Sequence, residues 1–181
     1  MSILTEEQKK LLKKYKSNFP VHVGKLAEEL GLTVISTTDL PSGMSGSISK
    51  EDERYIIYVN SGQSMRRQRF TIAHEIGHFL QHRDFLDTAD EILNPAKKIM
   101  LGRPDSGSRA PVDTIERQRE YEADNFAGEL LMPKEIFEDI WLKAESLKDV
   151  ADYFNVSAMA ANVRAALLGL GYFDEINGTH H

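Results

Sequence analysis

The sequence predicts an α+β protein with a small mixed sheet and several helices. Three short strands are expected at about residues 32–36, 45–50 and 54–59, and the last two flank an acidic turn at 51–53, as the strands of a hairpin would. Long segments on both sides of these strands carry apolar residues at helical spacing. No internal repeat or low-complexity tract interrupts this order.

The length and composition indicate one compact domain, with room for a small appendage. The chain has 181 residues, of which 41% are hydrophobic, and its 22 basic and 28 acidic residues give a net charge of −6. This acidic balance argues against a mainly electrostatic nucleic-acid binder. The lack of cysteine excludes a disulfide scaffold, a thiol nucleophile and any zinc finger that uses cysteine.

Targeting signals are not visible in the sequence. The first residues become charged at Glu6 and lack the apolar run of a signal peptide. No stretch approaches the ~20 apolar residues that a membrane span needs. We therefore expect a cytoplasmic protein that does not associate with membranes.

The helices of the first half are predicted from their caps and their periodicity. Thr5 and Gln8 form a capping-box pattern at the start of the first helix. A second helix is expected over about residues 21–30 and ends at Gly31, a residue suited to the position after a helix. A long helix is expected at 64–82, where apolar residues recur at helical spacing.

The second half begins with a weaker pattern. We expect a mobile loop at about residues 83–113, because Gly, Pro and Ser concentrate in its later part. Helical periodicity returns at 114–131. Three shorter helices are expected after it, at about 134–143, 146–154 and 157–168.

The residues that carry chemistry lie on the long helix, where positions 74–78 read H-E-x-x-H. His74 and His78 are about one helical turn apart, so both imidazoles can bind one tetrahedral ion. Glu75 lies about 100° further round the helix, beside the ion, where it can accept a proton from a zinc-bound water. The spacing predicts two zinc ligands and one general base. The alternative is a helix whose histidines are only surface or core-edge residues.

A catalytic zinc site needs a third protein ligand, which must be a histidine or a carboxylate in a chain without cysteine. His82 continues the histidine series at steps of four, but eight residues of helix span about 12 Å, too far for three ligands on one ion. We therefore expect His82 to lie in the second shell, to face the substrate or to end the helix.

Carboxylates on the predicted helix at 114–131 are better candidates. Glu120 and Asp124 are four residues apart and share a helix face, so Asp124 can accept the spare N–H of a ligating histidine while Glu120 binds the ion. Glu122 points about 200° away from Glu120, so only one of the two can face the metal. The alternative for this charged run is a solvated helix face without a role.

These motifs resemble the ImmA/IrrE family of bacterial zinc-dependent metallopeptidases. The matching residues are RFTIAHEIGHFLQH at 69–82 and EYEADNFAGELLMP at 120–133, and the resemblance extends over about residues 20–171.

The resemblance implies a zincin-like metallopeptidase core, with His74, His78 and Glu120 as Zn²⁺ ligands and Glu75 as the catalytic base. It also implies a partner, because relatives are understood to cleave helix-turn-helix transcriptional repressors and so to derepress genes of the stress response or of mobile genetic elements.

The segment at 147–164 has the pattern of a helix-turn-helix, with Ser157 as the cap of its second helix. We therefore expect a metallopeptidase core at residues 1–143 and a helical, helix-turn-helix-like subdomain at 144–181. Between residues 146 and 176, two basic residues stand against four acidic ones, and a charge of −2 does not suit a DNA-binding surface. We expect this subdomain to pack on the core or to dock the protein substrate, without direct nucleic-acid binding.

Two functions from different classes fit these observations. The favoured one is a zinc-dependent endopeptidase that uses Glu75 as its base. The alternative is a non-hydrolytic regulatory or antitoxin-type interaction protein that retains a metal site. The intact Glu75 favours the enzyme, since a relict site has no use for a general base.

Overall fold

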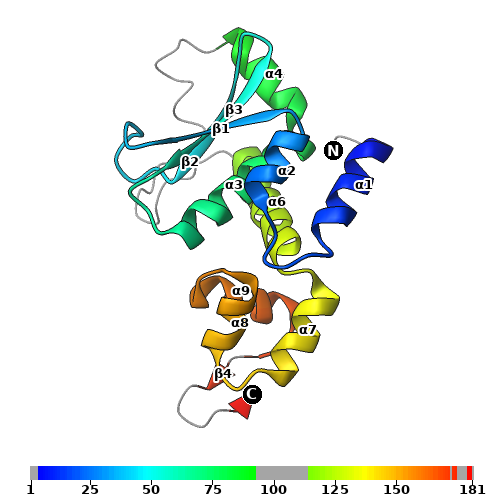
Figure 1. Ribbon diagram of the computed structural model, residues 1–181. Helices are drawn as coiled ribbons and strands as arrows, with labels where there is room; N and C mark the ends of the chain where they lie inside the picture. The colour runs from blue at the N-terminus through cyan, green and yellow to red at the C-terminus, as the bar shows by residue number, and fades with distance from the viewer. Residues whose placement is uncertain (1–3, 93–113, 172, 175–178, 181) are drawn as a thin grey trace.

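The computed structural model describes residues 4–92, 114–171, 173–174 and 179–180, and it confirms an α+β fold with a small mixed sheet. The elements in chain order are α1 (Glu6–Tyr15), α2 (Val23–Glu29), β1 (Leu32–Thr37), β2 (Gly46–Glu51), β3 (Arg54–Asn60), α3 (Met65–Gln81), α4 (Arg83–Ile92), α6 (Thr114–Leu131), α7 (Lys134–Lys143), α8 (Leu147–Phe154), α9 (Ala158–Leu168), β4 (Phe173–Asp174) and β5 (Thr179–His180). In Figure 1 the sheet lies at one end, α7, α8 and α9 lie at the other, and α3 and α6 lie between them.

The three-stranded sheet has the order β1-β3-β2, with β1 parallel and β2 antiparallel to β3. The predicted hairpin is confirmed, and its turn uses Asp52 and Glu53, whose φ angles are 46° and 66°. Tyr55, Ile57 and Val59 alternate into the core from β3, as expected for a strand with one face on the helices. β3 is the central strand, so β1 and β2 form the two edges of this sheet.

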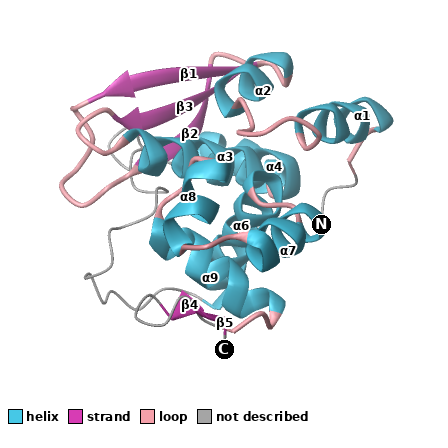
Figure 2. Cartoon of the chain, turned by 60° about the horizontal axis from the view of Figure 1, so that its bottom comes forward, coloured by secondary structure: helices cyan, strands magenta, loops and turns pink. Residues whose placement is uncertain are grey.

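Helix α3 is the central helix, because it contacts α2, β2, β3 and α4 and packs along α6. Figure 2 shows the sheet on one side of this helical layer. Gly77 permits the close approach of α3 and α6, since a Cβ atom there would lie 3.1 Å from Cδ1 of Phe126 and 3.2 Å from Cα of Ala123. The distance between the two helices therefore depends on a residue without a side chain.

The expectation of a loop at about 83–113 is wrong at its start, because Arg83–Ile92 forms helix α4. This short helix docks on the sheet: Arg83 Nε donates a hydrogen bond to Tyr55 Oη at 3.1 Å, and Leu86 is buried. Tertiary contacts of this kind stabilise a helix of only ten residues, which would be marginal in isolation. Residues 93–113, the rest of the expected loop, lie outside the described residues.

The other predicted helices are confirmed with small shifts at their ends. Thr5 and Gln8 form the expected capping box of α1. Ser146 and Ser157 cap α8 and α9, with side chains that accept hydrogen bonds from the backbone N–H groups three residues later. Asn155 joins the two helices in the left-handed conformation, with φ 51°.

Two arginines fasten the C-terminal helices to the rest of the chain. Arg69 on α3 donates hydrogen bonds to the carbonyl oxygens of Asn155, at 3.2 Å, and Val21, at 2.9 Å. Arg164 on α9 is only 8% exposed, and its Nε donates to the carbonyl oxygen of Met132 at 2.9 Å. These bonds hold α9 near the end of α6 and the turn before α9 near α3.

Strands β4 and β5 near the C-terminus pair antiparallel. They were not predicted, because two residues are too few to show a period. Among the described residues, no helix combines the length and the apolar character that crossing a bilayer requires. The division of the chain after residue 143 stays a prediction.

Candidate metal centre

The two histidines of the H-E-x-x-H sequence lie side by side on the buried face of α3. His74 is 1% exposed and His78 is 7% exposed. Their Nε2 atoms are 3.0 Å apart, although both are bases with a lone pair in the neutral form. The helix therefore places two nitrogen ligand atoms at one point, as the four-residue spacing predicts.

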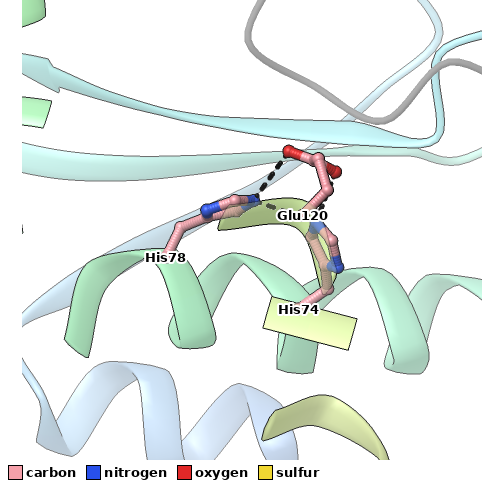
Figure 3. A group of neighbouring side chains, drawn as sticks. All are labelled: His74, His78 and Glu120. Atoms are coloured by element: carbon pink, nitrogen blue, oxygen red, sulfur yellow. Dashed lines mark hydrogen bonds and ion pairs between the residues drawn. The ribbon is translucent and has the colours of Figure 1, made fainter. Parts of the chain in front are cut away.

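Glu120 on α6 completes this group. Its Oε2 lies 3.4 Å from Nε2 of His74, and its Oε1 lies 3.2 Å from Nε2 of His78. Figure 3 shows the three side chains converging from α3 and α6. One ligand atom from each residue falls within 4.8 Å of the others, so His74, His78 and Glu120 could hold one metal ion.

Asp124 lies one turn after Glu120 and contacts the far side of His74. Its Oδ1 is 2.9 Å from Nδ1 of His74. A carboxylate at this position accepts the Nδ1–H hydrogen bond, which leaves the lone pair on Nε2 and fixes the orientation of the ring. The predicted pairing of Asp124 with a histidine of the motif is therefore present in the structure.

His82 and Glu122 lie together, away from the three converging ligand atoms. Nε2 of His82 is 3.6 Å from Oε2 of Glu122 and 3.3 Å from the carbonyl oxygen of Arg119. The ring of His82 still touches that of His78, with 5.4 Å between their centroids. Of the two acids that the sequence left open, Glu120 thus faces the paired histidines and Glu122 does not.

Glu75 is fully buried, and neither of its carboxylate oxygens has a hydrogen-bond partner among the described residues. Burial raises the pKa of Glu75, and the nearby His74 and His78 oppose this shift. A buried carboxyl without a partner is costly to keep in a protein interior, and such groups mark functional sites more often than chance.

The ligand cluster is electrostatically coupled. Burial alone lowers the pKa of His74, but hydrogen bonds with Asp124 and Glu120 outweigh burial and raise this pKa to about 10. Burial alone raises the pKa of Glu120, but hydrogen bonds with His74 and His78 bring it well below its usual range. In the metal-free protein, a proton on His74 thus compensates the carboxylates, and a bound cation would replace that proton.

Comparison with known proteins agrees with this site. The family described as the IrrE N-terminal-like domain matches residues 27–166, which is most of the chain. The chain belongs to the ImmA/IrrE family of metallopeptidases. This membership was predicted from the two motifs on α3 and α6.

Two curated ImmA/IrrE relatives match over part of their own length. Metallopeptidase ImmA from Bacillus subtilis is 24% identical over 122 residues, which cover 66% of this chain and 60% of ImmA. Radiation response metalloprotease IrrE from Deinococcus deserti is 30% identical over 135 residues, which cover 72% of this chain and 42% of IrrE. The chain thus matches about half of the length of these relatives.

A solved structure shows the same fold. A Mycobacterium tuberculosis transcriptional regulator aligns with a TM-score of 0.57 at 14% identity, over 88% of this chain and 46% of the regulator. At this identity the similarity concerns the arrangement of the elements alone.

Proposed function

We propose that this ImmA/IrrE-family protein is a cytoplasmic zinc-dependent endopeptidase that cleaves a helix-turn-helix transcriptional repressor and so derepresses stress or mobile-element genes. The observation that carries the proposal is the convergence of Nε2 of His74, Nε2 of His78 and a carboxylate oxygen of Glu120, next to the buried Glu75. Three protein ligands leave one position open, which is the arrangement of catalytic rather than structural zinc.

The spacing between the two imidazole nitrogens and the carboxylate group of Glu120 suits zinc. Zinc bonds of about 2.0–2.1 Å in a tetrahedron place neighbouring ligand atoms roughly 3.3 Å apart. The two Nε2 atoms are 3.0 Å apart, and each lies near a different oxygen of Glu120: Oε2 is 3.4 Å from His74 and Oε1 is 3.2 Å from His78. In the proposal Asp124 orients His74 through its 2.9 Å contact with Nδ1, and His82 supports the ring of His78.

Within this proposal each residue has a defined task. A bound zinc ion supplies Lewis acidity, which polarises the scissile carbonyl group and acidifies a water molecule. The carboxylate of Glu75 accepts a proton from the attacking water and passes it to the nitrogen of the leaving amine. Neither oxygen of Glu75 has a hydrogen-bond partner within the described part of the chain, so both are available for this transfer.

The helix-turn-helix-like character of α8 and α9 enters the proposal as a protein-docking rather than a DNA-binding element. Arg164 is the one basic residue of α9, and it is buried against Met132. The remaining side chains of α9 are apolar apart from Asn162, so they offer little for hydrogen bonds to base edges.

The test compares the wild-type protein with Glu75→Gln, both loaded with zinc and incubated with the repressor encoded beside the gene. We expect Glu75→Gln to keep one zinc ion per chain and to lose cleavage by about 10²–10⁴-fold, the usual contribution of a general base. Elemental analysis and mass spectrometry of the products measure the two quantities. Full activity of Glu75→Gln would refute the mechanism, and a stoichiometric complex without cleavage by the wild type would favour a non-hydrolytic regulator.

A further inference from the structure

A groove of about 500 Å³ lies between α6, α9 and the start of α3, on the side of α6 next to the metal centre. Of the nine large apolar side chains that are exposed in the described part of the chain, four line this groove: Tyr121, Met159, Val163 and Leu167. Exposed apolar side chains that gather in one place usually mark an interaction site, whereas scattered ones need no explanation.

The walls of the groove have the spacing of helix-packing surfaces. On α9 the residues Met159, Val163 and Leu167 follow one another at steps of four. On α6 the lining residues Tyr121, Asn125 and Gly128 are spaced by four and three. Such rows form ridges and grooves that receive the side chains of another helix.

The surface between these two rows of side chains is made by small residues. Gly128 has no side chain, and a Cβ atom at this position would meet only Cδ of Arg164, at 4.0 Å. Ala160 contributes a single methyl group from α9. Small residues between two ridges leave the space that a leucine or similar side chain of a third helix fills.

The charges of the lining select the occupant further. Three arginines and one aspartate line the groove of a protein whose net charge is −6: Arg66, Arg67, Arg164 and Asp124. Arg164 forms an ion pair with Glu129, and Arg66 forms one with Asp152, which also pairs with Lys148. Arg66 and Arg67 lie together in the first turn of α3, where the backbone N–H groups add positive potential. Asp152 balances only one of the two charges of Arg66 and Lys148, so this end of the groove keeps a positive charge, and an occupant with acidic residues there is electrostatically complementary.

We propose that this groove docks an amphipathic helix of the protein substrate, with its apolar stripe against α6 and α9 and its acidic residues toward Arg66 and Arg67. The proposal rests on the peptidase function, because the substrate supplies the helix. Asp124 lines the groove and also contacts His74 at 2.9 Å, so a helix docked there lies next to the metal centre. Docking of this kind would let the enzyme recognise a folded substrate independently of the amino-acid sequence at the cleavage site.

The binding experiment uses the Glu75→Gln protein, so that hydrolysis does not interfere. The probe is an 18-residue synthetic peptide with leucine at helical spacing and glutamate elsewhere, and its scrambled isomer is the control. With ¹³C-methyl methionine, we expect the peptide to shift the NMR signal of Met159, which is 73% exposed in the groove, and to leave that of Met44, outside the groove, unchanged. No shift of Met159, or an equal shift with the scrambled isomer, would overturn the proposal.

A matched pair of substitutions tests the location. Val163→Glu puts a charge on the wall of the groove, whereas Leu142→Glu puts the same charge on α7 outside it; the two residues are 51% and 70% exposed, so both variants should fold. We expect Val163→Glu to weaken peptide binding about tenfold or more and Leu142→Glu to leave it within about twofold. Equal effects of the two variants would overturn the proposal.

Two further readouts separate the possible failures. Repressor cleavage at the wild-type rate by a Val163→Glu enzyme would remove the docking role and leave the peptidase function intact. Groove-dependent peptide binding by a protein that cleaves nothing would support the groove and refute the peptidase function. A dimer that Val163→Glu dissociates, measured by light scattering, would assign the face to a second copy of the chain and overturn the proposal.

Discussion

Two neighbouring faces of helix α6 differ in what they present. One face carries Glu120 and Asp124, which are partly buried and contact the histidines of α3 at 2.9–3.4 Å. The adjacent face carries Tyr121, which is 57% exposed, along with Asn125 and Gly128 in the groove. The first face is polar and paired, and the second is largely apolar and open.

The difference shows how one helix can serve chemistry and recognition together. Polar groups in a buried cluster need partners at defined distances, so their positions are tightly constrained. Apolar side chains on an open face need only shape and area, so they tolerate change and can receive a partner. Substitutions on the two faces should therefore affect different measurements.

Removal of the proposed carboxylate ligand, Glu120, should have the largest effect. Mutation of a residue that only hydrogen-bonds a metal ligand typically weakens metal binding by about 10–100-fold. We expect Glu120→Ala to weaken zinc binding by more than this and to abolish cleavage. Zinc content after dialysis and a cleavage assay measure both. Glu122→Ala is the control on the same helix, since Glu122 contacts His82 instead; an equal loss in both variants would contradict the assignment.

Asp124 should come next, because the proposal gives it an effect on the metal through His74. Asp124→Ala removes the acceptor of the Nδ1–H bond, and we expect zinc affinity to fall by about 10–100-fold in competition with a chelator. Tyr121→Ala on the open face should leave zinc affinity unchanged and change the unfolding free energy by less than about 0.5 kcal/mol. If Tyr121→Ala lowers zinc affinity as much, the two faces are not separable.

Gly77 tests the packing that brings the polar face of α6 to α3. A methyl group there would press on Phe126 and Ala123, so we expect Gly77→Ala to destabilise the protein by about 1–3 kcal/mol in urea denaturation. Gly24→Ala is the matched control, because a Cβ atom at Gly24 in α2 meets nothing within 4 Å. That variant should gain about 0.5–1 kcal/mol, the usual helix preference of alanine over glycine. Stabilisation by both substitutions would show that α3 and α6 can separate at no cost.

The smallest expected effect is the release of a proton when zinc binds. The pKa of His74 in the metal-free protein is raised to about 10, so this imidazole is protonated at neutral pH and must lose its proton to bind a metal ion. We expect zinc binding at pH 7 to release about one proton, and apparent affinity to rise as the pH increases from 6 toward 10. Titration calorimetry in buffers of different ionisation enthalpy measures the release. A binding enthalpy that is the same in all buffers would contradict it.

Much of the fold was predictable, because the signals are local. Thr5 with Gln8, Ser146 and Ser157 mark helix starts through hydrogen bonds that span only three residues. The acidic turn between β2 and β3 marks a hairpin for the same reason. Helix α4 was missed although Phe85, Leu86, Ala89 and Ile92 recur at helical spacing, because the Gly-, Pro- and Ser-rich stretch that follows dominated the prediction for the whole segment.

At the candidate site, too, local features were predictable from the sequence and long-range contacts were not. The sequence alone determined that His74 and His78 share one face of a helix, since helical geometry sets the direction of both side chains. Helical geometry also set His82 aside, but only the tertiary structure decided that Glu120, rather than Glu122, meets the two histidines, because that choice depends on how α6 rotates and packs against α3 at Gly77. The groove beside α9 likewise exists only after α3, α6 and α9 come together, since its walls are far apart in the chain.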